Sequence, residues 1–233
     1  GHRGVWWAEI ETKGRIAHGS MPFLGDSAIR HMGAVLERFE RELWPALAQR
    51  RTQMPVAPEG ARASTLNVNS VHGGQAEPDR ADPNQGLPSP CVADSCRAVI
   101  DRRFLVEEPI AQVKGEVRGI LDALARERAG FRYELRDLFE VWPSMTDPDG
   151  AVVRATMQAV RDVVGREPAL ICSPGTYDQK HIDRIAGLRE CIAYGPGILD
   201  LAHQPDEYVA IDDLVASAKV MARAAHALLT RAA

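Results

Sequence analysis

The order of secondary-structure signals between residues 5 and 140 constrains the fold of this chain most strongly. Residues 5–13 are rich in β-forming side chains and lead into a polar loop at residues 14–22. Apolar residues then recur at helical spacing from Asp26 to about Gln49. Asp26 is the expected N-cap of this helix, and Pro45 is expected to end or kink it.

Two more strands, a second helix and a fourth strand continue the series. Residues 64–72 alternate polar and apolar side chains, and residues 93–104 are their expected partner strand. Pro109 suits the first turn of a helix that closes near Gly130, and residues 131–140 form the last strand. The order β-α-β-β-α-β predicts a ferredoxin-like α+β domain, with a four-stranded antiparallel sheet that carries both helices on one face.

The pattern changes after residue 142 and predicts a second, α/β domain. Thr146 or Asp147 is the expected cap of a helix that has Pro148 in its first turn and ends at Gly165. Short apolar runs at 169–172 and 191–194 predict buried strands, and helical periodicity returns at 211–227. Because helices alternate with apolar strands, we expect a parallel or mixed sheet.

Charge and composition exclude several classes of partner. The net charge of −4 and the isoelectric point near 6.0 leave no basic excess to bind nucleic acid or an anionic membrane. No apolar run reaches the length of a membrane span. The four cysteines do not have the spacing of a disulfide scaffold or a zinc site. We therefore expect reduced thiols in a cytoplasmic protein.

Four polar clusters fall in loops or at strand ends, where ligand sites of α/β proteins gather. They are His18 with Ser20, Asp101 with Arg102 and Arg103, residues 175–178, and His203 with Glu207. Each also has a structural interpretation, as a turn or a solvated strand end. His31, His72 and His226 are interpreted as structural.

Two catalytic interpretations fail on the residues alone. A serine hydrolase of the α/β type needs a G-x-S-x-G turn, which is absent. A self-contained zinc site needs about three protein ligands, and the H-E-x-x-H motif does not occur. Glu107 and Glu108 precede Pro109 and suit a helix N-terminus, where carboxylates favour the helix dipole.

Four ordered motifs carry a more specific signal. They are RGVWWAEIETKGRIAHGSMP at 3–22, IDRR at 100–103, SPGTYD at 173–178 and YGPGILDLAHQPDEYV at 194–209. Together they resemble the acetylornithine deacetylase and succinyl-diaminopimelate desuccinylase family of co-catalytic zinc amidohydrolases. The match covers nearly the whole chain, in the right order.

The resemblance implies two domains and a dimer. Residues 4–141 would be the lid, or dimerisation domain, and residues 142–233 the C-terminal part of a zinc-peptidase-like α/β/α catalytic domain. Lid domains of the family pair into a homodimer. Here the strand at 64–72, with Asn67, Asn69 and few charges, is the expected pairing edge. The alternative is a monomer whose edge is covered by residues 75–90.

The same resemblance assigns roles to individual residues. His18 corresponds to the lid histidine that reaches the partner subunit's site and polarises the scissile carbonyl. Arg103 corresponds to the arginine that holds a substrate carboxylate, a task that suits its planar fork of donors. Gly175 and Thr176 correspond to the substrate loop, although Lys180 stands about where relatives often have arginine.

Two assignments lie in less regular sequence. The substrate-binding asparagine of the family corresponds to Asn84 or Gln85, inside an insertion that makes the register uncertain. His203 corresponds to the C-terminal zinc ligand.

The implied activity is hydrolysis of an N-acyl amino acid or a peptide-like amide by a metal-activated water. It would use two zinc ions, with cobalt or manganese as alternatives. The other ligands and the general base of the family precede the lid, so we expect this chain alone to be inactive. The alternative is a non-catalytic dimerisation or ligand-binding module derived from such a hydrolase.

Overall fold

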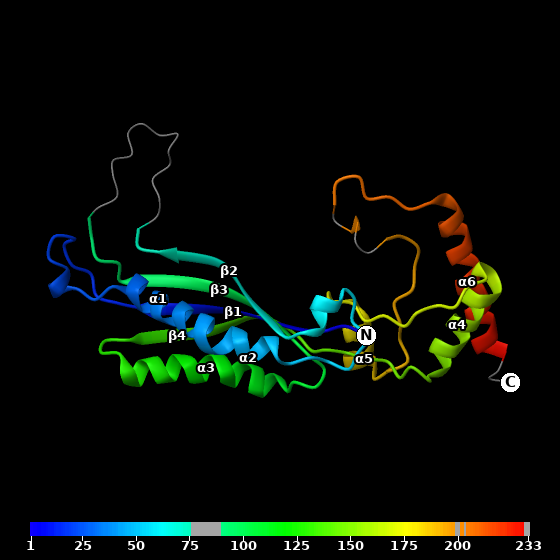
Figure 1. Ribbon diagram of the computed structural model, residues 1–233, viewed down its shortest axis with the longest axis horizontal. Coiled ribbons are helices and arrows are strands. Elements are labelled where there is room, and N and C mark those ends of the chain that lie inside the picture. The colour runs from blue at the N-terminus through cyan, green and yellow to red at the C-terminus, as the bar shows by residue number, and fades with distance from the viewer. Residues whose placement is uncertain (76–89, 199–200, 203, 231–233) are drawn as a thin grey trace. The chain divides into compact units, whose positions relative to one another are not determined.

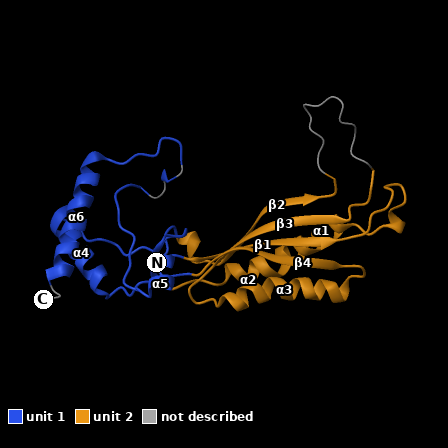
Figure 2. Cartoon of the chain, turned by 180° about the vertical axis from the view of Figure 1, so that it is seen from behind, with its two compact units in different colours: residues 1–2, 54–58, 143–233 blue, residues 3–53, 59–142 orange. Residues whose placement is uncertain are grey.

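The computed structural model describes residues 1–75, 90–198, 201–202 and 204–230, in two compact units (Figure 2). The sheet unit comprises Arg3–Gln53 and Glu59–Trp142. The helical unit comprises Gly1–His2, Met54–Pro58 and Pro143–Ala233. Among the described residues, no helix is both long and apolar enough to cross a membrane.

The sheet unit is built on four antiparallel strands. They are β1 (Gly4–Lys13), β2 (Thr65–Gly73), β3 (Ser95–Phe104) and β4 (Arg132–Val141), in the spatial order β2-β3-β1-β4. β1 and β3 are therefore central, and β2 and β4 are the edges. This order confirms the predicted ferredoxin-like arrangement.

The helices of the sheet unit cover one face of the sheet (Figure 1). They are α1 (Ala28–Arg38), a π-helical turn (Phe39–Leu43), α2 (Trp44–Ala48) and α3 (Ile110–Glu127), with short 3-10 turns at Pro22–Leu24 and Glu59–Arg62. Trp6, Ala8 and Ile10 point from alternate positions of β1 into one buried apolar cluster. The helices contribute Met32, Val35, Phe39, Val113, Val117 and Leu121 to the same cluster.

The start and the bend of the first helix differ from expectation. Ser27, not Asp26, is the N-cap, and its Oγ accepts a hydrogen bond of 3.3 Å from the Arg30 amide. The carboxylate of Asp26 instead lies 2.9 Å from Nε2 of His31. The predicted kink is a π-helical turn just before Pro45. The wider turn accommodates the proline ring and the loss of the hydrogen bond that proline, which has no amide hydrogen, cannot donate.

Arg102 is fully buried, so a solvated strand end is the wrong interpretation for this residue. Its Nη2 donates to Oε1 of Glu108 over 3.0 Å, and Oε2 of Glu108 accepts from Ser64 Oγ over 2.6 Å. Burial alone would raise the pKa of Glu108. The Ser64 hydrogen bond and the charge of Arg102 outweigh burial, so the pKa lies below its usual value. Glu108 thus connects β3 to the start of α3 through hydrogen bonds, in addition to the predicted role of a carboxylate at a helix N-terminus.

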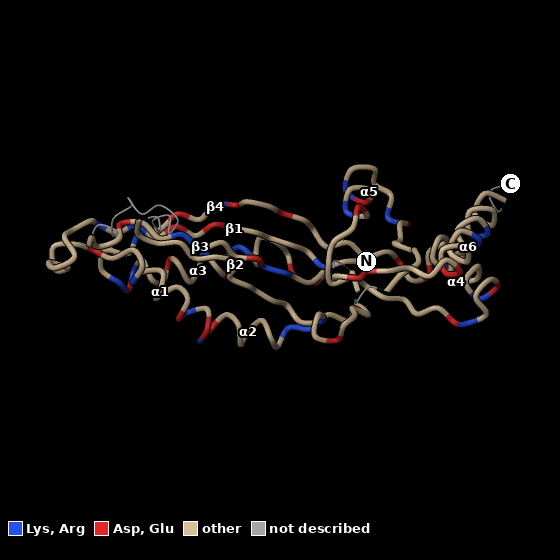
Figure 3. The backbone as a smooth tube through the Cα atoms, turned by 90° about the horizontal axis from the view of Figure 1, so that it is seen from above, with Lys and Arg blue, Asp and Glu red and all other residues tan. Residues whose placement is uncertain are grey.

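The sheet face opposite the helices carries a network of ion pairs. Lys and Arg are interspersed with Asp and Glu on the neighbouring strands β1, β3 and β4 (Figure 3). Glu11 is at its centre, 2.9 Å from Lys13 Nζ, 3.3 Å from Arg136 and 3.4 Å from Arg97. The hydrogen bond from Lys13 lowers the pKa of Glu11 to about 2, against the opposing effect of burial.

The helical unit contains α4 (Ala151–Val164), α5 (Gln179–Ala186) and α6 (Ile211–Thr230). Ala159 and Val160 of α4 pack against Val220 and Ala224 of α6. Neither Thr146 nor Asp147 caps α4. The Glu190 carboxylate caps it from a distant loop, accepting from the amides of Ala151 and Val152 over 3.1 and 3.2 Å.

The segments predicted as buried strands in this unit form no strand. Residues 169–172 make only an isolated bridge, between Cys172 and Val56, and Ile171 is exposed. Residues 191–194 belong to no helix or strand. Cys172 exchanges backbone hydrogen bonds of 3.0 and 3.3 Å with Pro55 and Ala57, but the described part of the helical unit contains no strand that could extend this pairing into a sheet.

Candidate functional site

His18 lies in the loop between β1 and α1, where its side chain is exposed. A bridge to Cys91 and a hydrogen bond from the Gly19 amide to the Pro90 carbonyl, 2.5 Å long, anchor the loop backbone. His18 is therefore held in a defined place although its ring faces solvent.

The neighbours of His18 fix which ring nitrogen carries the proton. The Ser20 amide donates to Nδ1 over 3.2 Å, and the Ser20 Oγ lies 2.8 Å from the same nitrogen. An atom that accepts from an amide carries no proton in the neutral ring, so the proton is on Nε2. This arrangement presents an N–H donor to solvent, as stabilisation of a developing oxyanion requires.

Arg103 lies on β3, on the sheet face opposite the helices. Asp101 holds its guanidinium in a bidentate pair, with Nε at 2.7 Å from Oδ1 and Nη2 at 2.8 Å from Oδ2. Both side chains are half-buried, so solvent screens the pair only partly. The fork is oriented by Asp101, and Nη1 remains on its open side.

Arg3 is a neighbouring cation that the motif analysis did not single out. Its Nη1 donates to the Ala63 carbonyl over 3.0 Å, beside the row in which Thr65 pairs with Arg103. Burial and then the charge of Arg103 lower the pKa of Arg3. In the sequence it is the first residue of the motif at 3–22, immediately before the first strand.

His18 and Arg103 lie toward opposite ends of the sheet. Arg103 pairs with Val5 near the start of β1, whereas His18 follows the end of β1 at Lys13. From Val5 to Lys13 the strand advances about 3.3 Å per residue, or roughly 26 Å. The two side chains of one chain cannot contact the same small molecule.

The predicted substrate loop of the helical unit follows Ser173, which is buried. Ser173 Oγ accepts a hydrogen bond of 3.0 Å from the Gly175 amide, and Thr176 beside it is half-buried. The Lys180 ammonium donates to the Tyr177 carbonyl over 3.0 Å. Lys180 is thus turned back onto its own loop.

The remaining predicted site residues, Asn84 and His203, lie outside the described residues. In the described ranges, no three His, Cys, Asp or Glu side chains are grouped so that they could hold a metal ion. The described part of the chain therefore does not by itself fit the predicted zinc centre.

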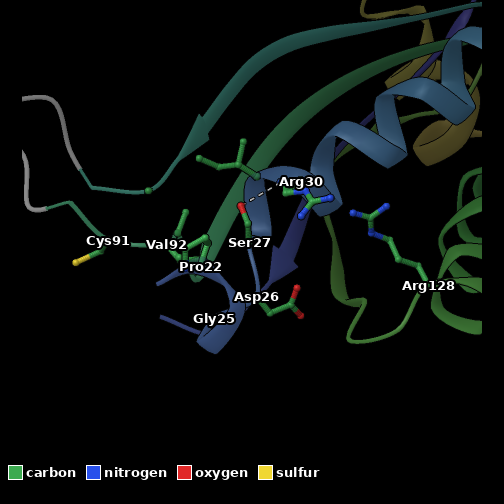
Figure 4. Close-up of a pocket in the computed structure, with 11 residues that line it drawn as sticks. Pro22, Gly25, Asp26, Ser27, Arg30, Cys91, Val92 and Arg128 are labelled. Carbon is green, nitrogen blue, oxygen red and sulfur yellow. Dashed lines mark hydrogen bonds between the residues drawn. The ribbon is translucent and has the colours of Figure 1, made fainter. Parts of the chain in front are cut away.

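The sheet unit also contains a cavity of about 410 Å³ at the N-terminus of α1 (Figure 4). Asp26, Ser27, Arg30 and Arg128 supply its polar wall, and Val92 and Ile29 are among its apolar residues. No sequence motif points to this place, because its residues come from four separate segments of the chain.

Comparison with known proteins places these features in a family. The family model described as "peptidase dimerisation domain" matches residues 1–129, which are more than half of the chain. The chain belongs to the M20 peptidase dimerisation-domain family. The resemblance inferred from the four motifs is thereby confirmed.

Curated relatives match over nearly all of the chain. Acetylornithine deacetylase of Myxococcus xanthus is 29% identical over 225 residues, which are 96% of this chain and 52% of that protein. Succinyl-diaminopimelate desuccinylase of Azoarcus sp. strain BH72 is 27% identical, over 99% of this chain and 53% of that protein. The M20 chain thus spans about half the length of the curated relatives it matches.

Solved structures agree on the fold. An M20 family metallo-carboxypeptidase, Sso-CP2 from Sulfolobus solfataricus, superposes with a TM-score of 0.69 at 20% identity, over 96% of this chain and 58% of that one. Human carnosine dipeptidase 1 superposes with a TM-score of 0.67 at 16% identity, over 96% and 54%. At these identities the likeness establishes the fold alone.

Proposed function

We propose that the protein is a metal-dependent amidohydrolase that cleaves an N-acyl amino acid or a peptide-like amide, and that the sheet unit is its lid. Support comes from family membership and from relatives named as a deacetylase and a desuccinylase. In this proposal residues 4–141 form the lid, and residues 142–233 belong to the catalytic domain. We also propose a cytoplasmic location, which fits the buried thiols of Cys96 and Cys172.

The separation of His18 and Arg103 is the observation that carries the mechanism. Because the two lie toward opposite ends of β1, they can serve one reaction only if they come from different copies of the chain. In the proposed site, Arg103 binds the carboxylate of the substrate bound to its own subunit. His18 of the partner copy donates from Nε2 to the oxygen of the scissile carbonyl.

The metal and the remaining contacts follow from the family resemblance. The proposed cofactor is a pair of zinc ions, with cobalt or manganese as alternatives, and His203 is one proposed ligand. Zinc would supply a nucleophilic water at neutral pH. Gly175, Thr176 and Asn84 are proposed to contact the substrate, with the Gly175 amide already oriented by Ser173.

The dimer is proposed to form along β2. Of the two edge strands, β2 has no Asp, Glu, Lys or Arg from Thr65 to Gly73. β4 carries five such residues, which are Arg132, Glu134, Arg136, Asp137 and Glu140. Charged side chains discourage pairing along a sheet edge, so β2 is the edge that suits a second copy.

Steady-state kinetics of the complete protein, loaded with zinc, test the roles of the two residues. With N-acetyl and N-succinyl amino acids, His18→Ala should lower kcat about 100-fold or more, as loss of an oxyanion donor does. Arg103→Ala should instead raise KM at least tenfold, as loss of a charge-assisted hydrogen bond does. Arg118→Ala, an exposed arginine on α3, is the matched control. Unchanged kinetics in both variants would overturn the assignment.

A further inference from the structure

The cavity at the N-terminus of α1 contains two guanidinium groups turned toward each other (Figure 4). One belongs to Arg30 on α1, and the other to Arg128 just past α3. Within the described residues, neither makes an ion pair with a carboxylate. Two like charges that face one opening repel each other unless an anion or solvent lies between them.

A buried histidine fixes one of these guanidinium groups in place. Arg128 Nε donates to Nδ1 of His31 over 2.9 Å, and His31 is only 1% exposed. The other ring nitrogen, Nε2, therefore carries the proton and lies 2.9 Å from Asp26 Oδ1, while Phe131 packs edge-on against the ring. Because Arg128 uses Nε for this hydrogen bond, both of its terminal nitrogens can bind a ligand in the cavity. His31 holds the guanidinium in position before a ligand arrives.

The charge of the cavity favours an anion. The two guanidinium groups outweigh the single carboxylate of Asp26, which already faces His31. Ser27 and the first turn of α1 add the positive end of the helix dipole. The volume of about 410 Å³ is within the range of small-molecule sites.

We propose that this cavity binds the oxyanion group of a small molecule, a carboxylate or a phosphate, between Arg30 and Arg128. The site is separate from the proposed substrate contacts and does not depend on the proposed function. The wall also includes Pro22 and Gly25, from the segment that follows His18. An anion bound here would therefore contact the loop that presents His18.

The test uses the 233-residue chain, with inorganic phosphate and succinate as probes at constant ionic strength. Nε–Hε resonances of the arginines are followed by NMR, and calorimetry measures affinity. We expect saturable binding, with a Kd on the order of 1 mM for one probe or both. The resonances of Arg30 and Arg128 should shift, and the probe that binds more tightly identifies the oxyanion.

Two exposed arginines provide the matched comparison. Arg30→Gln should weaken binding about tenfold or more, because it removes a charge-assisted contact. Arg126→Gln removes the same charge in the last turn of α3 but does not line the cavity, so the affinity should stay within about twofold. Equal losses in both variants, or no saturable shift at Arg30 and Arg128 with either probe, would overturn the proposal.

Discussion

Asp101 is the residue that sets the direction of the Arg103 guanidinium, through two bonds of 2.7 and 2.8 Å. Asp101→Asn keeps the shape but cannot accept both N–H groups, so the fork loses its fixed orientation. In the complete enzyme we expect KM to rise about tenfold while kcat changes little. Steady-state kinetics with an N-acyl amino acid measure the split, and an equal fall in kcat would point to a general structural role instead.

Gly130 and Gly119 form a natural pair for testing backbone strain. Gly130 has a φ of +77°, and an added Cβ would clash with the carboxylate of Asp26, so Gly130→Ala should cost about 1–3 kcal/mol of unfolding free energy. Gly119 is exposed within α3 and an added Cβ meets nothing within 4 Å. Gly119→Ala should stabilise by about 0.5–1 kcal/mol. Urea unfolding measures the free energy of unfolding of both variants. A Gly130→Ala variant as stable as the wild type would contradict the structure of that turn.

Single residues also show where local sequence patterns stop being informative. Arg102 stands in a charged run that predicts a solvated strand end, yet it is buried because Glu108 and Ser64 approach it from other segments. His31 lies at a helix position that gives no sign of its contact with Asp26 or its hydrogen bond from Arg128. Such contacts depend on tertiary structure, which no window of sequence contains.

At the scale of elements, the sheet network around Glu11 makes folding stability depend on acid pH. The pKa of Glu11 in the folded state, about 2, is below the ordinary glutamate value of 4.5. The stabilising contribution is thus complete above about pH 4.5 and is lost as the pH falls toward 2. Glu11→Gln should lower stability at pH 7 by about 1–3 kcal/mol and flatten the decline between pH 4.5 and 2.

Chemical unfolding at a series of pH values measures this effect. Glu134→Gln is a suitable control, because Glu134 contacts the same Lys13 and Arg136 but its side chain is about half exposed. The Glu134→Gln substitution should lower stability clearly less than Glu11→Gln does, because solvent screens the exposed ion pairs. A wild-type chain whose stability does not fall below pH 4.5 would contradict the proposed role of Glu11.

The elements of the sheet unit, and α4 of the helical unit, were predictable because each has a strong local signal. Strand alternation, helix periodicity, Pro109 and Gly165 gave the strands and the helix ends correctly within a few residues. The helix start at Ser27 and the cap from Glu190 were missed, since neighbouring Asp26 competes in the first case and the partner is distant in sequence in the second. The expected strands at 169–172 and 191–194 were wrong, because apolar composition alone supplies no hydrogen-bonded neighbour.

At the scale of the whole molecule, the proposed dimer depends on the uncharged edge of β2. Asn67→Pro removes a backbone donor on that edge strand and should weaken dimerisation by tenfold or more without unfolding α4 and α6. Sedimentation velocity at micromolar concentration measures the change. Arg136→Pro on the other edge, β4, is the positional control. A wild-type chain that sediments as a monomer would contradict the proposal.

The family and the roles of His18 and Arg103 could be proposed from sequence because they lie in motifs with fixed spacing. Their placement toward opposite ends of β1 needed the structure, since strand register decides it. The cavity between Arg30 and Arg128 could not be predicted, because its residues are scattered along the chain. The roles of Asn84 and His203 remain proposals, because both residues lie outside the described ones.

Subunit complementation tests the central claim, that one site combines Arg103 of one copy with His18 of another. Complete His18→Ala and Arg103→Ala proteins are unfolded, mixed in equal amounts and refolded together. They are assayed at a substrate concentration well below the wild-type KM, where a lower kcat and a higher KM both reduce the rate. Half of the dimers should then be mixed and contain one intact site each, so activity should return to about a quarter of the wild-type value. Mixed dimers with no more activity than the parent variants would contradict the shared site.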